Sequence, residues 1–391
     1  MLPLPLANSS WDEEEYEAIQ RVISSNRFTM GPEVESFERE FANYFGSKYC
    51  VMSNSGSSAN LLAVAALTHS NRHRLSPGDE VIVPAVSWST TFYPLHQYGL
   101  KIKFVDIDPE TLNLDLAQIE EAISPKTRMV LAVNLLGNPN NFDRLLDICD
   151  SNDLILMEDN CESMGAKFGG NYSGCFGLVG TFSSFFSHHI STMEGGMTVT
   201  DCEELYQLMV SLRAHGWTRD LPKDNHIAEM SNDSFMESFR FVLPGYNLRP
   251  LEISGAIGQS QLRKLEQIVE GRRLNAAVFK EEFSGIDGIS IQKEVGESSW
   301  FGFSILIENG SQRFDLVRKL VRNEVEVRPI VAGNFVRNPV IKLMDYEISG
   351  NLKGADQVHE NGLFFGNHHY DISEELGAIS GVVRGHMEGG V

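Results

Sequence analysis

Apolar runs alternate with amphipathic stretches along the first two thirds of the chain. Short runs rich in Val, Ile and Leu predict strands at 80–84, 102–107, 129–134 and 154–158. After an opening helix at about 12–25, helical spacing of apolar positions recurs at 57–68, 115–122 and 142–149. This alternation predicts an α/β fold whose mostly parallel central sheet is covered by helices on both faces. Ligands of such sheets bind at the carboxyl ends of the strands.

The pattern changes after Pro250. A long helical pattern covers about 258–283, and strand, helix and strand patterns follow at 300–307, 314–322 and 325–329. This order predicts a smaller α+β domain attached through the long helix. We therefore expect an N-terminal helix and large domain in residues 1–258 and a small C-terminal domain in residues 259–391.

Charge and cysteine content narrow the class of protein. Acidic residues outnumber basic ones 53 to 32, for a net charge of −21, which argues against a nucleic-acid partner but not against an anionic ligand in a locally positive pocket. The N-terminus lacks the pattern of a secretory signal, and the most apolar run, 61–67, is too short for a membrane span. The five cysteines show no CxxC spacing, so no metal cluster is indicated, and we expect a cytoplasmic protein.

Three segments carry candidate chemistry. The small residues of 53–60 (SNSGSSAN) precede an apolar helix whose N-terminus can bind an anion, although they also suit a plain helix cap. Asp159 follows a predicted strand, where it would either pair with a cation such as a pyridinium nitrogen or cap the next loop. The hydroxyl-rich stretch 181–196 contains His188 and His189. Adjacent side chains diverge on regular structure, so this pair does not favour a metal site.

Taken together, these segments resemble the sugar aminotransferase family of deoxyamino-sugar biosynthesis, which has the aspartate aminotransferase-like, type I pyridoxal phosphate (PLP) fold. The motifs that carry the resemblance stand in the family's order over nearly the whole chain: SGSSAN, VPAVSWSTT, VNLLGNPNN, EDNCESMGA, FSSFFSHH with MEGG, and GYNLRPLE. Each motif alone is weak, but the ordered set is specific. The resemblance implies a PLP-dependent enzyme.

One position departs from the family's pattern. The family has a lysine six residues before the Glu of its E-G-G signature, and that lysine binds PLP covalently; here the position is His188, six residues before Glu194. Imidazole forms no stable Schiff base, so we expect PLP to be held non-covalently and to cycle through pyridoxamine 5'-phosphate (PMP). With an ordinary pKa near 6.5, His188 would serve as the catalytic base.

The histidine resembles the deoxygenating branch of the family. This implies 3-dehydration of a GDP-linked 4-keto-6-deoxy sugar, with L-glutamate as amino donor, in deoxysugar (colitose-type, O-antigen) biosynthesis. A sister branch has extra cysteines for an iron–sulfur cluster, but no cysteine follows Cys202 here, so no iron–sulfur reductase partner is expected. The alternatives are a PLP-dependent nucleotide-sugar 4-aminotransferase that uses His188 as proton carrier, and a non-enzymatic cofactor-binding regulator.

The resemblance also implies the other site residues and a homodimer with shared active sites. The cofactor-binding residues would be Gly56, Ser57, Trp88, Asp159, Glu162, Ser183 and Asn247. The substrate-binding residues would be Phe28, Thr29, Met30, His215, Arg219, Arg249 and Glu326. Trp88 would stack on the cofactor ring, Asp159 would pair with its nitrogen, and Asn247 would reach in from the second subunit. Arg249 would bind the glutamate carboxylate through its guanidinium fork.

Overall fold

The larger of two main sheets forms the base of the molecule. The computed structural model describes residues 3–389. The strands of this sheet are β1 (Tyr49–Ser53), β2 (Glu80–Pro84), β3 (Lys101–Val105), β4 (Thr127–Val133), β5 (Ile155–Asp159), β8 (Val179–Ser183), β9 (Gly196–Thr200) and β13 (Tyr346–Ile348). They lie in the order β1-β9-β8-β5-β4-β2-β3-β13. Among the eight strands of this sheet, β9 alone runs in the direction opposite to the others, so the predicted α/β architecture with a mostly parallel sheet is confirmed.

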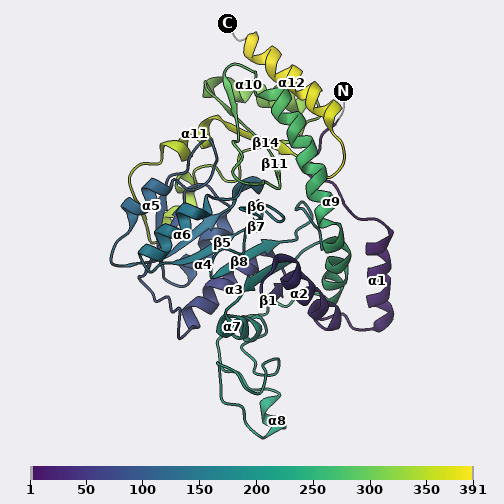
Figure 1. Ribbon diagram of the computed structural model, residues 1–391, viewed down its shortest axis with the longest axis vertical. Helices are drawn as coiled ribbons and strands as arrows, with labels where there is room; N and C mark the ends of the chain where they lie inside the picture. Colours follow the sequence, from purple (N-terminus) through teal and green to yellow (C-terminus); the bar gives the residue numbers. More distant parts are fainter. Residues whose placement is uncertain (1–2, 390–391) are drawn as a thin grey trace.

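Helices cover both faces of this sheet (Figure 1). One face packs against α3 (Gly56–His69), α4 (Ser89–Gln97) and α7 (Glu203–Arg213). The other packs against α5 (Leu116–Ala122), α6 (Phe142–Ser151), α2 (Pro32–Phe45) and α9 (Glu252–Phe283). Alternate side chains of β2 point to opposite faces of the sheet. Val81 and Val83 pack in the core under α3, α4 and α7, and Ile82 packs in the core under α5 and α6.

A second, antiparallel sheet lies at the other end of the molecule. Its strands, in spatial order, are β10 (Ile289–Ile291), β11 (Gly302–Ile307), β14 (Gly362–Gly366) and β12 (Val327–Arg328). The distal part of α9 packs on this sheet together with α10 (Arg313–Arg322) and α12 (Ser373–Glu388). Figure 1 shows α9, which has 32 residues, running alongside both parts of the molecule. It thereby contributes to the cores of both sheets.

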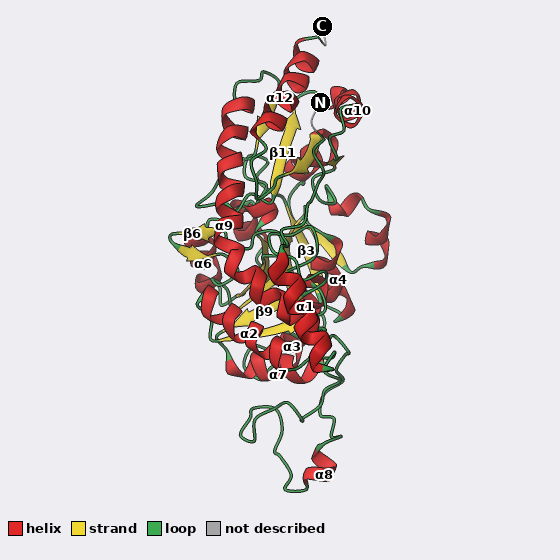
Figure 2. Cartoon of the chain, turned by 90° about the vertical axis from the view of Figure 1, so that its right-hand side faces the viewer, coloured by secondary structure: helices red, strands yellow, loops and turns green. Residues whose placement is uncertain are grey.

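The remaining elements lie at the periphery. Helix α1 (Glu13–Ser25) packs on the outside of α9, whereas α11 (Lys353–Asn361) packs near β11 and β14. A long segment between α7 and α9 projects from the base and carries α8 (Ser234–Glu237) near its tip (Figures 1 and 2). The short elements are β6 (Lys167–Phe168), β7 (Asn171–Tyr172) and the 3-10 turns Leu135–Gly137, Gly310–Gln312, Phe335–Arg337 and Pro339–Leu343.

The start of α9 differs from the sequence prediction. The helix begins at Glu252, whereas the pattern predicted about 258. Its first turns contain Gly255 and Gly258, which lower the helical propensity of this stretch. The sequence pattern therefore predicts a later start. The same glycines let α2 approach closely, since an added Cβ would lie 2.6 Å from Val34 N and 2.6 Å from the Phe37 ring respectively.

Two further differences concern the C-terminal part. The predicted strand at 325–329 is reduced to the two residues of β12, and β13 joins the larger sheet beside β3. The division at residue 258 falls inside α9 and stays a prediction. Within residues 3–389, no helix combines the length and apolarity that a bilayer crossing requires.

Candidate active site

A cavity of about 410 Å³ lies at the carboxyl ends of β5 and β8. The first turns of α3 and α4 form one wall, and Phe301, Arg328 and Phe364 of the C-terminal part form another. Predicted site residues that line this cavity are Gly56, Ser57, Trp88, Asp159, Glu162, Ser183 and His188. The volume is within the usual range for small-molecule and cofactor sites.

One end of the cavity suits an anion. Helix α3 begins at Gly56, and the Ser55 side chain caps it by accepting from Ser58 N at 3.1 Å. An added Cβ on Gly56 would lie 2.6 Å from Ser183 Cβ, so only glycine permits this close contact. The Ser57 hydroxyl bonds that of Thr90 at 2.8 Å. Hydroxyls and free backbone N–H groups at a helix N-terminus are suited to bind a phosphate.

Asp159 is fixed in the cavity wall. Its Oδ2 accepts from Asn60 Nδ2 and Thr91 Oγ1, both at 2.8 Å, and its Oδ1 accepts from Cys161 N at 3.2 Å. Thr91 is held in turn by the Ser87 hydroxyl at 2.8 Å. A buried carboxylate with neutral donors can still pair with a cation, such as a protonated ring nitrogen.

Trp88 precedes the first turn of α4 and lines the same cavity. Its side chain is 59% exposed, which is unusual for so large an apolar group. The exposed indole offers a flat surface on which a planar ring can stack.

Glu162 lies beside a turn with unusual backbone geometry. Its Oε2 accepts from Leu136 N at 3.1 Å, and Leu136 has a φ of 55°, in the left-handed region that non-glycine residues rarely adopt. Burial raises the pKa of Glu162 to about 7; the Leu136 N–H opposes this effect and the charge of Asp159 adds to it. The carboxyl group is therefore protonated in a large part of the molecules at neutral pH and can donate a hydrogen bond.

His188 lies in the segment 184–195 between β8 and β9, which we call the His188 loop. Its ends are joined by Ser184 N donating to Gly195 O and Thr192 N donating to Ser184 O, both at 2.9 Å. The imidazole packs edge-on against Phe301, with ring centroids 5.1 Å apart. Its Nδ1 is buried without a hydrogen-bond partner within residues 3–389. The ring therefore lines the cavity while packing against Phe301, and no polar contact holds it at Nδ1.

The pKa of His188 differs from the sequence expectation. Burial, with a smaller effect of the nearby Arg272 cation, lowers this pKa to about 3, so the expected value near 6.5 is wrong for the ligand-free chain. The ring is neutral at physiological pH and free to accept a proton. An anionic ligand beside it would raise the pKa and make it a stronger base.

The neighbouring His189 does not line the cavity. Its Nε2 bonds Ser299 O at 3.0 Å, and burial lowers its pKa well below the usual value. Within the described part of the chain, no cluster of three or more metal-ligating side chains occurs. His189 is thus a structural residue that connects the His188 loop to the C-terminal part.

The other predicted site residues lie outside this cavity. Most gather near the projecting segment: the Arg219 guanidinium lies 4.2 Å from the centre of the Trp217 ring, and Arg249 Nε donates to Asn247 Oδ1 at 3.0 Å. The backbone around Phe28 is bonded to the same region through Glu252 N. Those near this region are Phe28, Thr29, His215, Arg219, Asn247 and Arg249. Met30, which follows Thr29, packs against the core of β1, α2 and α9.

Glu326 is separate from both groups. Its Oε2 accepts from Leu6 N at 3.0 Å, so it holds the N-terminal segment. The single chain does not bring these eight residues into its own cavity, and their roles in binding stay predictions. The sequence motifs predict which residues form the site, but they do not show how far apart those residues lie.

Several cavity residues were missed by the sequence analysis. Asn60, Thr90 and Thr91 were quoted within the SGSSAN and VSWSTT motifs, and their position beside Gly56 and Trp88 could have identified them. Phe301, Arg328 and Phe364 carry no local signal, because only the packing of the small sheet brings them to the cavity.

Comparison with known proteins extends this picture. The model of the DegT/DnrJ/EryC1/StrS aminotransferase family matches residues 9–380. A GDP-4-keto-6-deoxy-D-mannose 3-dehydratase of Yersinia pseudotuberculosis is 56% identical over 388 residues, which cover 98% of this chain and 99% of the relative.

Solved structures agree with the sequence match. The E coli GDP-4-keto-6-deoxy-D-mannose-3-dehydratase with bound hydrated PLP has a TM-score of 0.96 at 54% identity, covering 98% of this chain and 99% of that one. An H188N mutant of a GDP-4-keto-6-deoxymannose-3-dehydratase with bound GDP-perosamine has a TM-score of 0.95 at 54% identity, covering 97% and 100%. The family predicted from the motifs is thus confirmed: this chain belongs to the DegT/DnrJ/EryC1/StrS aminotransferase family.

Proposed function

We propose that this chain removes the C3 hydroxyl group of GDP-4-keto-6-deoxy-D-mannose. The products would be GDP-4-keto-3,6-dideoxy-D-mannose, 2-oxoglutarate and ammonia, with L-glutamate as amino donor and PLP as cofactor. The observation that carries the proposal is His188, which lines the cavity at the position where the family's aminotransferases have their cofactor-binding lysine. High identity to dehydratases over the full chain supports it.

The cavity residues fit PLP. Gly56, Ser57 and Ser183 would hold the phosphate at the N-terminus of α3, and Asp159 would pair with the ring nitrogen. The crowding around Gly56 and the position of the His188 ring in the cavity lining support this arrangement. When bound, the cofactor supplies an electron sink and, in its PMP form, the amine that activates the sugar.

His188 would move the protons of the reaction. Its neutral ring accepts a proton without first losing one, and its side chain offers no amine that could bind the cofactor covalently. Phe185 and Phe301 pack around the ring at 5.9 and 5.1 Å between centroids, which limits water near the transferred proton. Glu162, protonated in part at neutral pH, can donate to an oxygen on the bound ring.

We further propose a homodimer with shared active sites. The cations Arg219 and Arg249 suit the glutamate carboxylate or the diphosphate, yet they lie outside the cavity of their own chain. In a twofold dimer they would reach the partner's cavity, together with Asn247.

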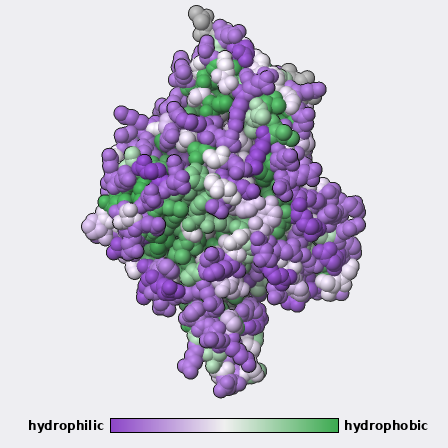
Figure 3. Space-filling view, viewed as in Figure 1, coloured by the Kyte–Doolittle hydropathy of each residue, from purple (hydrophilic) through white to green (hydrophobic). Residues whose placement is uncertain are grey.

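Exposed apolar surface supports this assembly. Figure 3 shows apolar area across the middle of the face seen in Figure 1. Phe235 and Phe239 on the projecting segment are 82% and 71% exposed. Surface of this kind is typical of protein interfaces. All five cysteines are unpaired, which suits the reducing cytoplasm that we propose as its compartment.

The main alternative is a 4-aminotransferase that uses His188 as its proton carrier. The protein should be incubated with PLP, glutamate and GDP-4-keto-6-deoxy-D-mannose, and the nucleotide-sugar products identified by mass. The proposal expects a 3-deoxy-4-keto sugar, whereas a 4-amino sugar that retains its C3 oxygen would favour the alternative.

A further inference from the structure

Both backbone groups of Ser191, three residues after His188, are held by side chains from outside the His188 loop. Trp11 Nε1 donates to Ser191 O at 2.9 Å, and Ser191 N donates to Gln261 Oε1 at 3.0 Å. Trp11 belongs to the N-terminal segment and Gln261 to α9. We call these two side chains the Ser191 clamp.

The amide of Gln261 is fully buried and uses both of its ends. Its Oε1 also accepts from the Ser10 hydroxyl at 2.7 Å, and its Nε2 donates to Glu15 Oε1 at 2.9 Å and to Ser10 O at 3.3 Å. A carboxylate such as Glu15 only accepts and a backbone N–H only donates. These partners therefore allow only one orientation of the Gln261 amide, the one that accepts from Ser191.

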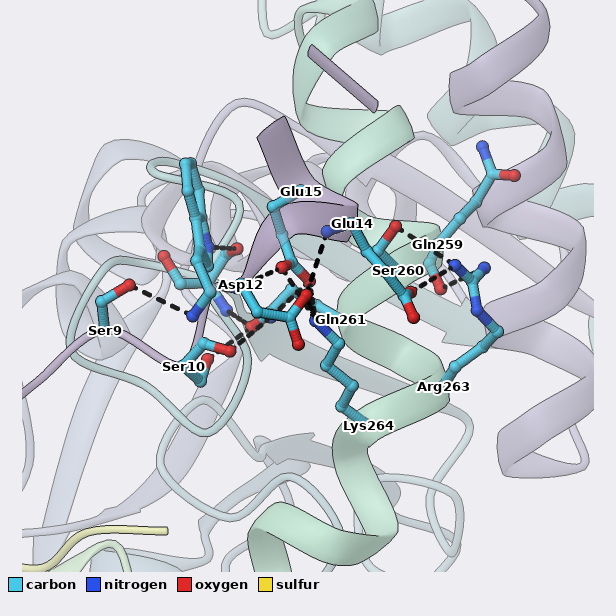
Figure 4. A network of polar contacts seen from close by, with 12 residues as sticks. Ser9, Ser10, Asp12, Glu14, Glu15, Gln259, Ser260, Gln261, Arg263 and Lys264 are labelled. Atoms are coloured by element: carbon cyan, nitrogen blue, oxygen red, sulfur yellow. Dashed lines mark hydrogen bonds and ion pairs between the residues drawn. The ribbon is translucent and has the colours of Figure 1, made fainter. Parts of the chain in front are cut away.

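Glu15 anchors this amide from α1. Figure 4 shows Glu15, Gln261 and Lys264 meeting between α1 and α9. The buried Glu15 carboxylate lies 2.8 Å from Lys264 Nζ at both oxygens and accepts from Asp12 N at 2.8 Å. Burial alone would lower the pKa of Lys264, but the bonds to Asp12 and Glu15 outweigh it and raise that pKa, so the lysine stays charged. The Gln261 side chain of the clamp is thus hydrogen-bonded to a buried carboxylate whose charge is paired with Lys264.

The position of His188 depends on how its loop is held. Its Nδ1 has no hydrogen-bond partner within residues 3–389, so no polar contact at that atom orients the ring. We propose that Gln261 is a positioning residue which, together with Trp11, fixes the His188 loop at Ser191 and thereby places the imidazole in the cavity. The inference rests on the proposed function of His188, although the clamp itself can be tested without any ligand.

The test compares the same substitution at two positions of α9. Gln261→Met keeps the length of the side chain but cannot accept from Ser191. Gln259→Met is the control, because within residues 3–389 the Gln259 amide bonds Glu33 alone. Hydrogen exchange of peptides from the His188 loop is measured on the ligand-free proteins. The kcat and KM for GDP-4-keto-6-deoxy-D-mannose are measured with PLP and glutamate present.

We expect Gln261→Met to accelerate exchange in the His188 loop and to lower kcat by about tenfold with little change in KM, because a small misplacement of a catalytic group costs rate. Gln259→Met should change neither. If Gln261→Met fails to fold, Trp11→Phe, which removes a single donor, takes its place with the same expectations. Unchanged loop exchange and kcat in a variant with a lower Tm would overturn the proposal and leave a purely structural role. If the wild-type protein showed no dehydration, the proposed function would fail separately, while the exchange result would still decide whether the clamp holds the loop.

Discussion

Replacing Glu162 with glutamine should stabilise the ligand-free protein more at pH 8 than at pH 5. Burial raises the pKa of Glu162 from 4.5 to about 7, with the charge of Asp159 adding to the effect and the Leu136 N–H opposing it. Between these two values the folded state binds more protons at this carboxyl than the unfolded state does. The free energy of unfolding therefore falls as the pH rises through this window, because the ionised carboxylate is disfavoured in the cavity wall.

The size of the effect follows from the two pKa values. Raising the pH from 5 to 8 should cost the wild-type protein about 2.5 kcal/mol at this one group, by linkage between its folded and unfolded pKa. Glutamine has no such titration, and its amide oxygen can still accept from Leu136 N. The advantage of Glu162→Gln over the wild type should thus grow by about 2.5 kcal/mol over this range.

The assay is equilibrium unfolding in urea at the two pH values. His188 and His189 are common to both proteins, so their contributions cancel in the difference. Glu110→Gln, which removes one partner of an exposed ion pair with Lys293, is a matched control that should shift stability little at either pH. A difference between Glu162→Gln and the wild type that is the same at pH 5 and pH 8 would refute the raised pKa.

Three other predictions concern the proposed reaction. His188→Asn should lower dehydration at least 100-fold while PLP binding, followed by absorbance, stays within a few-fold of wild type, since general-base catalysis contributes about that much; near-full activity would make the base assignment wrong. Borohydride reduction of the PLP-loaded wild type should leave its mass unchanged, whereas His188→Lys should gain the mass of one cofactor; no gain would mean that position 188 does not face the cofactor aldehyde. Mixed dimers of Asn247→Asp and His188→Asn chains should regain activity through one intact site, and well-folded inactive mixed dimers would show that each site is built from one chain.

The local pattern of apolar residues was sufficient to predict the strands that are buried on both faces of the sheet. Strands β2 and β5 are short apolar runs between helices, so their sequence alone predicts them. The start of α9 was missed, because Gly255 and Gly258 have low helical propensity. These glycines are needed for the close approach of α2. The residue type at such positions depends on packing between elements that are distant in sequence, which a local pattern cannot predict.

The site was predictable in a similar, partial way. Motifs located Gly56, Asp159 and His188, which all line the cavity, because the proposed phosphate binding, ring pairing and proton transfer each need a particular residue type. The depressed pKa of His188 was not predictable, since it depends on burial and on Arg272, which is distant in sequence. The wall formed by Phe301 was missed for the same reason.

The fate of the amino group that glutamate donates tests the central claim most directly. The protein is incubated with PLP, ¹⁵N-labelled glutamate and GDP-4-keto-6-deoxy-D-mannose, and the label is located by mass spectrometry in the nucleotide sugar and in free ammonium. If His188 directs deoxygenation, the label appears in ammonium and the sugar has lost its C3 oxygen. Label retained in a sugar that keeps its C3 oxygen would contradict the account and identify an aminotransferase.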